Sequence, residues 1–114
     1  MPAYQGAYYS KSIALKLRSD GSAINVTGWT LRSMLRTRDM AEDDPPLLEL
    51  TSANGGWAIL DALGGRIAMQ ITALQTLDLP VGWIEFDIMR TDAVPGPIFQ
   101  CEGRFLVKQP QTRD

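Results

Sequence analysis

Apolar and polar side chains alternate at a period of two along much of this chain. In residues 12–18, for example, Ile13, Leu15 and Leu17 fall on one side. Successive side chains of a β-strand point to opposite faces, so this alternation predicts a strand with one buried face. Alternation or a short apolar run predicts further strands over residues 23–26, 29–36, 47–51, 57–60, 66–71, 81–90 and 98–107.

Three of these strands indicate which side chains should face the core. Ser33 is the one polar residue on the inward face of the strand over residues 29–36, and it weakens that pattern slightly. The expected inward positions are Trp29, Leu31, Leu35, Ile84, Phe86, Ile88, Phe99, Cys101, Phe105 and Val107.

Turn signals separate the strands. They are Asp20-Gly21, Asn54-Gly55-Gly56, Gly64-Gly65 and the proline-rich residues 91–97. Residues 72–79 are the one helix-compatible segment, with Thr72 as the N-cap and Pro80 ending the helix after one or two turns.

Short strands at regular spacing, without alternating helices, predict an all-β fold: an antiparallel sandwich or flattened barrel of seven to eight strands with one helical turn. The 114 residues, 45% apolar and 21% charged, are enough for one domain. We expect an N-terminal arm over residues 1–10, a sandwich domain over residues 11–108 and a polar C-terminal tail over residues 109–114.

Charge and composition narrow the chemistry. The chain has no histidine and a single cysteine, Cys101, which excludes histidine-dependent catalysis, disulfides within the chain and multi-cysteine metal sites. We expect no enzymatic activity, no catalytic residues, no cofactor and no metal. A net charge of −2 without a basic cluster predicts no nucleic-acid partner.

Glu85 and Asp87 are the first candidate site, because two carboxylates on one strand face could serve acid–base chemistry. Solvent-exposed strand positions explain them better, since an antiparallel sheet normally has one polar face. In a hairpin with the closing strand over residues 98–107, these carboxylates would face residues such as Arg104 or Glu102.

An acidic loop is the second candidate, since its oxygens could bind calcium. It lacks the ligand spacing and the glycine of an EF-hand, so we expect a solvated loop. Its acidic residues are Asp39, Glu42, Asp43 and Asp44.

The tryptophans and the thiol are the remaining candidates. We expect Trp29 in the core, whereas Trp83 falls on the polar face of its strand and could lie in an interface. For Cys101, expected between two inward phenylalanines, the prediction is an inert buried thiol.

No apolar run approaches the roughly 18 to 20 residues that span a bilayer, and the first ten residues show no signal-peptide pattern. We therefore expect no membrane partner and a reducing, cytoplasm-like setting.

Several segments stand in an order that resembles small virion proteins of tailed bacteriophages, including the N-terminal sandwich domains of phage baseplate proteins. These segments are residues 26–30 (VTGWT), a strand that ends at Arg36, residues 65–71 (GRIAMQI), the turn over residues 72–79, residues 83–88 (WIEFDI) and residues 101–107 (CEGRFLV).

The resemblance implies an immunoglobulin-like β-sandwich that is a building block of the tail, baseplate or head–tail region, made in the host cytoplasm and located in the virion. Its partners would be other virion proteins and copies of itself in a homo-oligomer. Exposed sheet edges could receive strands from neighbours. We expect Tyr4, Tyr8, Tyr9 and Trp83 in these interfaces, with the arm and the tail loose before assembly.

Two other functions remain open. One is a carbohydrate- or host-receptor-binding sandwich module that uses Trp57 or Trp83 with the acidic loop. The other, which we favour least, is a small hydrolase that uses Glu85 and Asp87.

Overall fold

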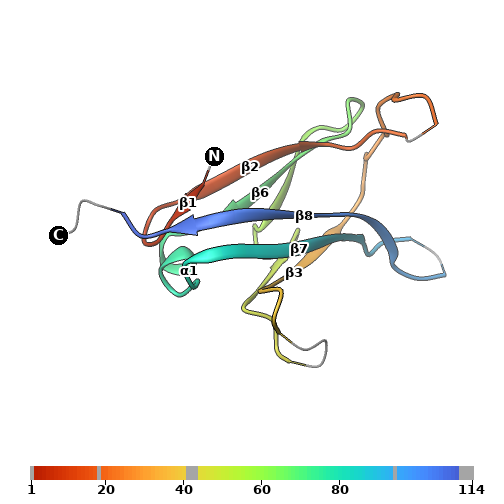
Figure 1. Cartoon of the computed structure of the whole chain (residues 1–114). Helices are drawn as coiled ribbons and strands as arrows, with labels where there is room; N and C mark the ends of the chain where they lie inside the picture. Colours follow the sequence, from red (N-terminus) through yellow and green to blue (C-terminus); the bar gives the residue numbers. More distant parts are fainter. Residues whose placement is uncertain (1, 18, 41–43, 94, 111–114) are drawn as a thin grey trace.

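The computed structural model describes residues 2–17, 19–40, 44–93 and 95–110. Within these residues the chain forms two facing β-sheets and one short helix (Figure 1). The elements are β1 (Ala3–Tyr4), β2 (Tyr9–Ala14), β3 (Leu31–Arg36), β4 (Leu48–Thr51), β5 (Trp57–Asp61), β6 (Arg66–Ile71), α1 (Ala73–Leu77), β7 (Gly82–Arg90) and β8 (Ile98–Lys108).

The larger sheet has five strands in the order β1-β8-β7-β3-β4, and the smaller has three in the order β2-β6-β5. This arrangement confirms the all-β, sandwich-like prediction. The expectation of purely antiparallel pairing was wrong at one place, because β1 runs parallel to β8. A tight turn, in which the Ala7 N–H donates to the Tyr4 carbonyl at 3.0 Å, then carries the chain directly from β1 into the other sheet as β2.

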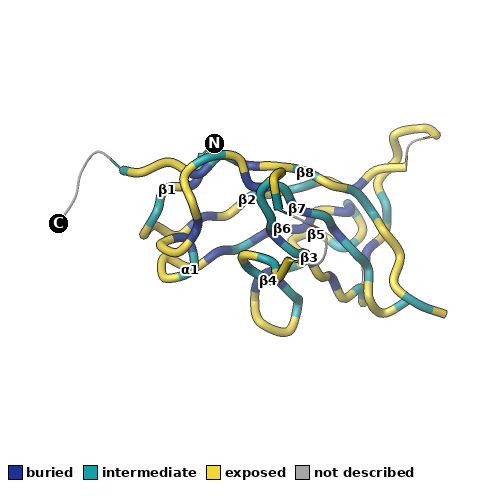
Figure 2. The backbone as a smooth tube through the Cα atoms, turned by 60° about the horizontal axis from the view of Figure 1, so that its bottom comes forward, coloured by how far each residue is buried: buried dark blue, intermediate teal, exposed yellow. Residues whose placement is uncertain are grey.

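The core lies between the two sheets and consists mainly of aliphatic side chains. The buried residues form the dark blue stretches of the backbone in Figure 2. Alternation placed these residues correctly on β3 and β7. The fully buried apolar residues of the two strands are Leu31, Leu35, Ile84 and Ile88. Phe86 and Phe105 extend this core across β7 and β8, with ring centroids 6.2 Å apart.

A β-bulge changes which side chains of β8 face inward. Ile88 pairs with Cys101, but Met89 pairs with Phe99, so Gln100 is an extra residue on β8. One extra residue reverses the alternation beyond it. The prediction that Phe99 points inward was therefore wrong, and its side chain is 54% exposed. Phe105 and Val107, on the other side of the bulge, are buried as expected.

The first strand of the smaller sheet lies earlier than the pattern indicates. β2 ends at Ala14, and Leu17, predicted on its inward face, is exposed. Residues 23–26 form no strand; Ala23 makes only an isolated bridge with Lys16. A Cβ on Gly65 would lie only 2.6 Å from the carbonyl oxygen of Leu15. The segment after β2 therefore approaches the β5–β6 turn so closely that the turn requires glycine at position 65.

The predicted helical turn is confirmed. Thr72 is the N-cap of α1, and its hydroxyl accepts from the backbone N–H of Gln75 while the Gln75 side chain accepts from the N–H of Thr72. The buried Thr76 hydroxyl then donates to the Ala7 carbonyl at 2.8 Å. This bond fastens the helix to the N-terminal segment.

No helix of the described residues has the length and apolar character to cross a bilayer. The segment 111–114 of the predicted C-terminal tail lies outside the described residues, as do Glu42 and Asp43 of the acidic loop.

Candidate interaction surface

The outer faces of β7 and β8 carry charged side chains that face one another across the ladder. Glu85 pairs with Arg104, and Asp87 pairs with Glu102. The first pair brings opposite charges together, whereas the second places two carboxylates directly opposite each other, which is unfavourable. The register expected from the sequence is therefore confirmed, and it leaves local negative charge at Asp87 and Glu102.

The two carboxylates of the first candidate site have different structural contacts. Glu85 lies 3.5 Å from the guanidinium of Arg38. Asp87 accepts a hydrogen bond of 3.2 Å from the backbone N–H of Met34, at a position where β3 and β7 show no paired residues. The Asp87 side chain thus supplies an acceptor to β3 where the ladder between the strands is interrupted.

A cavity of about 600 Å³ lies over this charged face. Its lining combines the acidic residues with Arg36, Arg38, Arg104 and Met34. Every buried side-chain nitrogen and oxygen of the described residues has a hydrogen-bond partner, and no group of three metal-ligating side chains occurs among them. The cavity therefore has a lining of mixed charge, and no buried side-chain nitrogen or oxygen in it lacks a partner.

Trp83 lies at the end of the same face. Its side chain is 52% exposed, and the Arg104 guanidinium lies over its ring, 4.5 Å from the centroid. Both residues line a second cavity of about 300 Å³, together with residues that include Lys11 and Phe105. Trp83 is thus available to a partner, with a cation already stacked on one face of the indole.

The three tyrosines of the N-terminal segment do not share one environment. Tyr8 is 60% exposed and Tyr4 is 41% exposed, so both are accessible as expected. Tyr9 is buried, and its ring stacks on that of Phe105 at 5.1 Å between centroids. Burial raises the pKa of Tyr9 above its ordinary value. Tyr9 is therefore part of the core and offers no area to a partner.

The N-terminal segment is also paired with the domain. Ala3 is buried opposite Val107, and the side chain of Gln5 donates to the Leu79 carbonyl at 2.7 Å. The expectation of a loose arm over residues 1–10 does not hold for the described residues 3–9, because strand pairing and burial fix them.

An apolar end of the molecule was missed by the sequence reasoning. Leu74 and Leu77 of α1 are exposed beside the turn that holds Tyr8, and Gly6 lies close to Leu77. Val81, which follows the helix, is exposed as well. A helix of one or two turns has little surface to bury, so its leucines at positions 74 and 77 could have indicated this exposed apolar end.

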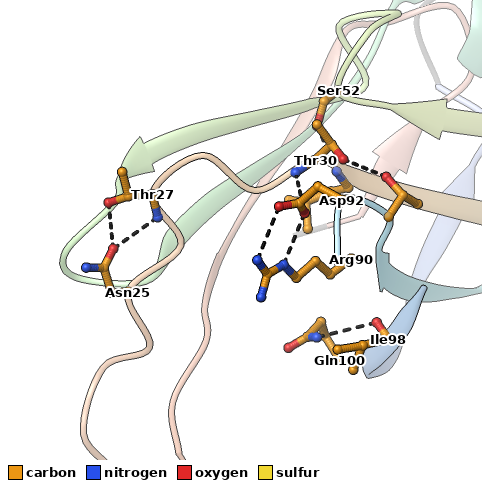
Figure 3. A network of polar contacts seen from close by, with 10 residues as sticks. Asn25, Thr27, Thr30, Ser52, Arg90, Asp92, Ile98 and Gln100 are labelled. Carbon is orange, nitrogen blue, oxygen red and sulfur yellow. Dashed lines mark hydrogen bonds and ion pairs between the residues drawn. The ribbon is translucent and has the colours of Figure 1, made fainter. Parts of the chain in front are cut away.

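At the opposite end, a polar network joins the loops that precede β3 and follow β7 (Figure 3). Asp92 accepts hydrogen bonds from the side chain of Arg90 at 3.1 Å and from the backbone N–H of Thr30 at 3.1 Å. These bonds hold the pKa of Asp92 below its ordinary value. Arg90 in turn lies 4.4 Å from the ring centroid of the partly buried Trp29, so the predicted core position of Trp29 holds in part.

Trp57 is buried, with 3% of its surface exposed. Its indole therefore cannot take part in the carbohydrate- or receptor-binding module considered above, because a sugar ring must stack on an accessible face. That alternative keeps only Trp83 among its two named aromatics.

The thiol of Cys101 is half-buried against the core. Burial and, to a smaller extent, the neighbouring Glu102 raise the pKa of the thiol above its ordinary value, which lowers the thiolate fraction. In the acidic loop, Asp39 accepts a hydrogen bond of 2.6 Å from the Thr37 hydroxyl, a local turn contact.

One unpaired sheet edge of the described residues belongs to β8. The Gln5 N–H donates to the Lys108 carbonyl at 3.0 Å, which shows that Lys108 directs its backbone groups toward the β1 side. Since these groups alternate along a strand, Glu102, Arg104 and Leu106 direct theirs toward the same side. In the parallel register of Ala3 with Val107, Ala3 bonds to the backbone of Leu106 and Lys108, so β1 occupies this edge from Leu106 onward. Among the described residues, β7 is therefore the one paired neighbour of residues 101–105, here called the open span, and the unpaired groups of the open span belong to Glu102 and Arg104.

The fold and this surface define a small all-β, sandwich-like domain whose accessible chemistry is a strand edge, a charged face and exposed aromatics. No protein-family model matches the chain, and no curated protein matches it.

Proposed function

We propose that this chain is a non-enzymatic structural component of a tailed-bacteriophage particle, in its tail, baseplate or head–tail region, and that it works through contacts with other virion proteins and with copies of itself. The order of the segments that resemble phage virion proteins supports this function. An immunoglobulin-like arrangement of the sandwich belongs to the same proposal.

The observation that carries the proposal is the open span of β8. Unpaired N–H and C=O groups at a sheet edge can bind an extended segment of another protein through a new ladder. In the open span these groups belong to Glu102 and Arg104. A strand added there would extend the five-stranded sheet beyond β8.

The other sheet edges are less suited to this role. On β2, Lys11 shares the inward-facing side with Tyr9, and a charge directed inward at an edge opposes pairing with another chain. β4 has only four residues and follows Pro45 and Pro46, and β5 has a register shift between Ile59 and Asp61. The open span contains neither proline nor lysine.

Exposed aromatic side chains would add contact area around this edge. Trp83 lies on the neighbouring strand, and tyrosine and tryptophan are enriched in protein interfaces. Tyr4 and Tyr8 could contribute at the α1 end of the molecule. Tyr9 is not part of this proposal, because it is buried within the chain.

The test is incorporation of the chain into particles. Arg104→Pro removes one N–H from the unpaired side of β8, where proline is tolerated, and Arg104→Ala is the matched control that keeps the N–H. We expect tagged wild-type chain in purified particles, and much less Arg104→Pro than Arg104→Ala although both variants fold. Absence of the wild-type chain from particles would overturn the proposal.

A deletion of residues 2–9 would be a poor test. It would remove the buried Ala3 and Tyr9 and destabilise the domain, so lost incorporation could not be assigned to lost contacts. Substitution of the exposed Tyr8 by alanine avoids this difficulty.

A further inference from the structure

We infer that two copies of this chain form a symmetric dimer in which β8 pairs antiparallel with β8 of the second copy, centred on Gly103. The inference rests on the proposed function, because it names the contact by which copies of the chain would assemble. Three features of the open span support it: its extent, its charges and its inward-facing side chains.

The extent of the open span defines the centre of the pairing. The bulge at Gln100 limits the open span at one end, and β1 occupies the edge from Leu106 at the other. Gly103 is the midpoint of the open span, between Cys101 and Phe105. A two-fold axis at Gly103 therefore lets the whole open span of each copy pair without displacing β1 of either copy.

The charges select the same register. With the axis at Gly103, Glu102 of each copy lies opposite Arg104 of the other, and both opposite-charge pairs are favourable. A shift by one residue toward either end preserves the two-fold axis but places either Glu102 opposite itself or Arg104 opposite itself. Like charges directly opposite each other are unfavourable, so only the register centred on Gly103 is complementary.

Glu102 has a reason to accept a cation from a second copy. It is exposed, it faces Asp87 across the ladder, and no ion pair to it occurs among the described residues. Arg104 is held in place by its contact with Trp83, 4.5 Å from the ring centroid. The dimer would thus bring a positioned guanidinium to the most negative part of the face.

The inward-facing side chains are compatible with the pairing. In this register Cys101 of one copy lies opposite Phe105 of the other, so the half-buried thiol would meet an aromatic side chain at the junction of the two cores. Apolar contact at this junction would add to the backbone ladder.

Charge reversal tests the inference. We expect the wild-type chain to sediment as a dimer, and Glu102→Arg or Arg104→Glu alone to raise the dissociation constant at least about tenfold, because each change turns both opposite-charge pairs into like-charge pairs. Mixed in equal amounts, the two variants are complementary and should form a heterodimer. The double variant Glu102→Arg/Arg104→Glu should recover the homodimer.

Matched reversals on β4 and β3 are the controls. Glu49→Arg and Arg32→Glu change the same charges at the other side of the sheet, where the two residues form an exposed ion pair at 3.2 Å, and we expect no change in dimerisation. A wild-type chain that stays monomeric at every soluble concentration would overturn the inference. So would a dimer that the single reversals at 102 and 104 leave intact, or folded single variants that fail to associate when mixed.

Different outcomes test the β8 dimer and the proposed function. A monomeric chain that is nevertheless found in purified particles would overturn the β8 dimer alone. A dimer with the expected charge dependence, from a chain that is absent from particles, would overturn the proposed function alone.

Discussion

The indole N–H of Trp57 donates a hydrogen bond of 3.1 Å to the hydroxyl of Ser33, and this bond joins the two sheets through the core. Trp57 belongs to β5 and Ser33 to β3, and both side chains are buried. A buried polar group is costly unless it is paired. The bond therefore explains why a serine occupies the one polar inward position of β3.

Ser33→Ala should destabilise the domain by about 1 to 3 kcal/mol, because it leaves the buried indole N–H without an acceptor. Urea unfolding followed by tryptophan fluorescence measures this change. Ser12→Ala on the exposed face of β2 is the control and should change the free energy of unfolding by less than about 0.5 kcal/mol.

The pairing can be separated from burial by a double-mutant cycle with Trp57→Phe. Each single change leaves one buried polar group, the indole N–H or the Ser33 hydroxyl, without a partner. The double variant Ser33→Ala/Trp57→Phe leaves neither, so we expect it to be more stable than the sum of the two single changes predicts. Strict additivity would show that the two side chains are not coupled.

The N-terminal tyrosines should differ sharply in their effect on stability. Tyr9→Ala removes a buried ring that stacks on Phe105, and we expect a loss of about 3 kcal/mol. Tyr8→Ala removes an exposed ring and should cost less than about 0.5 kcal/mol. Thermal and urea unfolding of the two variants compare these values; similar small losses would mean that residues 3–9 are not part of the folded domain.

Gly103 should resist substitution although it lies on a strand with an exposed edge. A Cβ at this position would meet the Phe86 ring at 2.8 Å, so Gly103→Ala should destabilise the domain by about 1 to 3 kcal/mol. No atom lies within 4 Å of a Cβ built on Gly96, and Gly96→Ala is therefore the matched control. Equal stability of the two variants, measured by urea unfolding, would contradict the close packing of β8 on Phe86.

Asp92 should contribute pH-dependent stability. Its hydrogen bonds, first that from the Arg90 side chain and then that from the Thr30 backbone, lower its pKa below the ordinary value of an aspartate in the folded chain. A carboxyl with a lowered folded-state pKa stabilises the fold above its unfolded-state pKa, and this stability is lost as the pH falls through the folded-state value.

The measurement compares wild type with Asp92→Asn by urea unfolding from about pH 6 to about pH 2. The stability advantage of the wild type should be largest at the upper end and should shrink on acidification. A difference that stays constant over the whole range would show that Asp92 is not held by these bonds.

Most of the strands could be predicted from the sequence because side-chain alternation depends on local geometry. The strand β6 has the bounds that the pattern indicates, residues 66–71. The helix that follows begins after the predicted N-cap, Thr72. The inward position of Ile84 and Ile88 follows from the same period of two. These features need no knowledge of distant residues.

The remaining features depend on distant partners. The inversion of Phe99 arises from one extra residue at Gln100, which only the register with β7 reveals. The burial of Tyr9 needs Phe105, nearly the whole chain away, and the parallel entry of β1 beside β8 leaves no local signal. The burial of Trp57, which the sequence also allowed as an exposed binding residue, depends on its partner Ser33 in the other sheet.

The surface shows the same division. Trp83 and Tyr8 are exposed as their sequence positions indicate. The open span of β8 could not be predicted, because it depends on how far β1 extends along the edge and on which strands neighbour β8.

Hydrogen–deuterium exchange over residues 98–108, measured on the wild-type chain at low and high protein concentration, most directly tests whether the edge of β8 is an assembly contact. We predict that the backbone amides of Glu102 and Arg104 exchange fast when the chain is dilute and become protected as its concentration rises, while the amides of Cys101 and Phe105, which face β7, stay protected throughout. Fast exchange of the two edge amides at all concentrations, also when the chain is bound in purified particles, would contradict it.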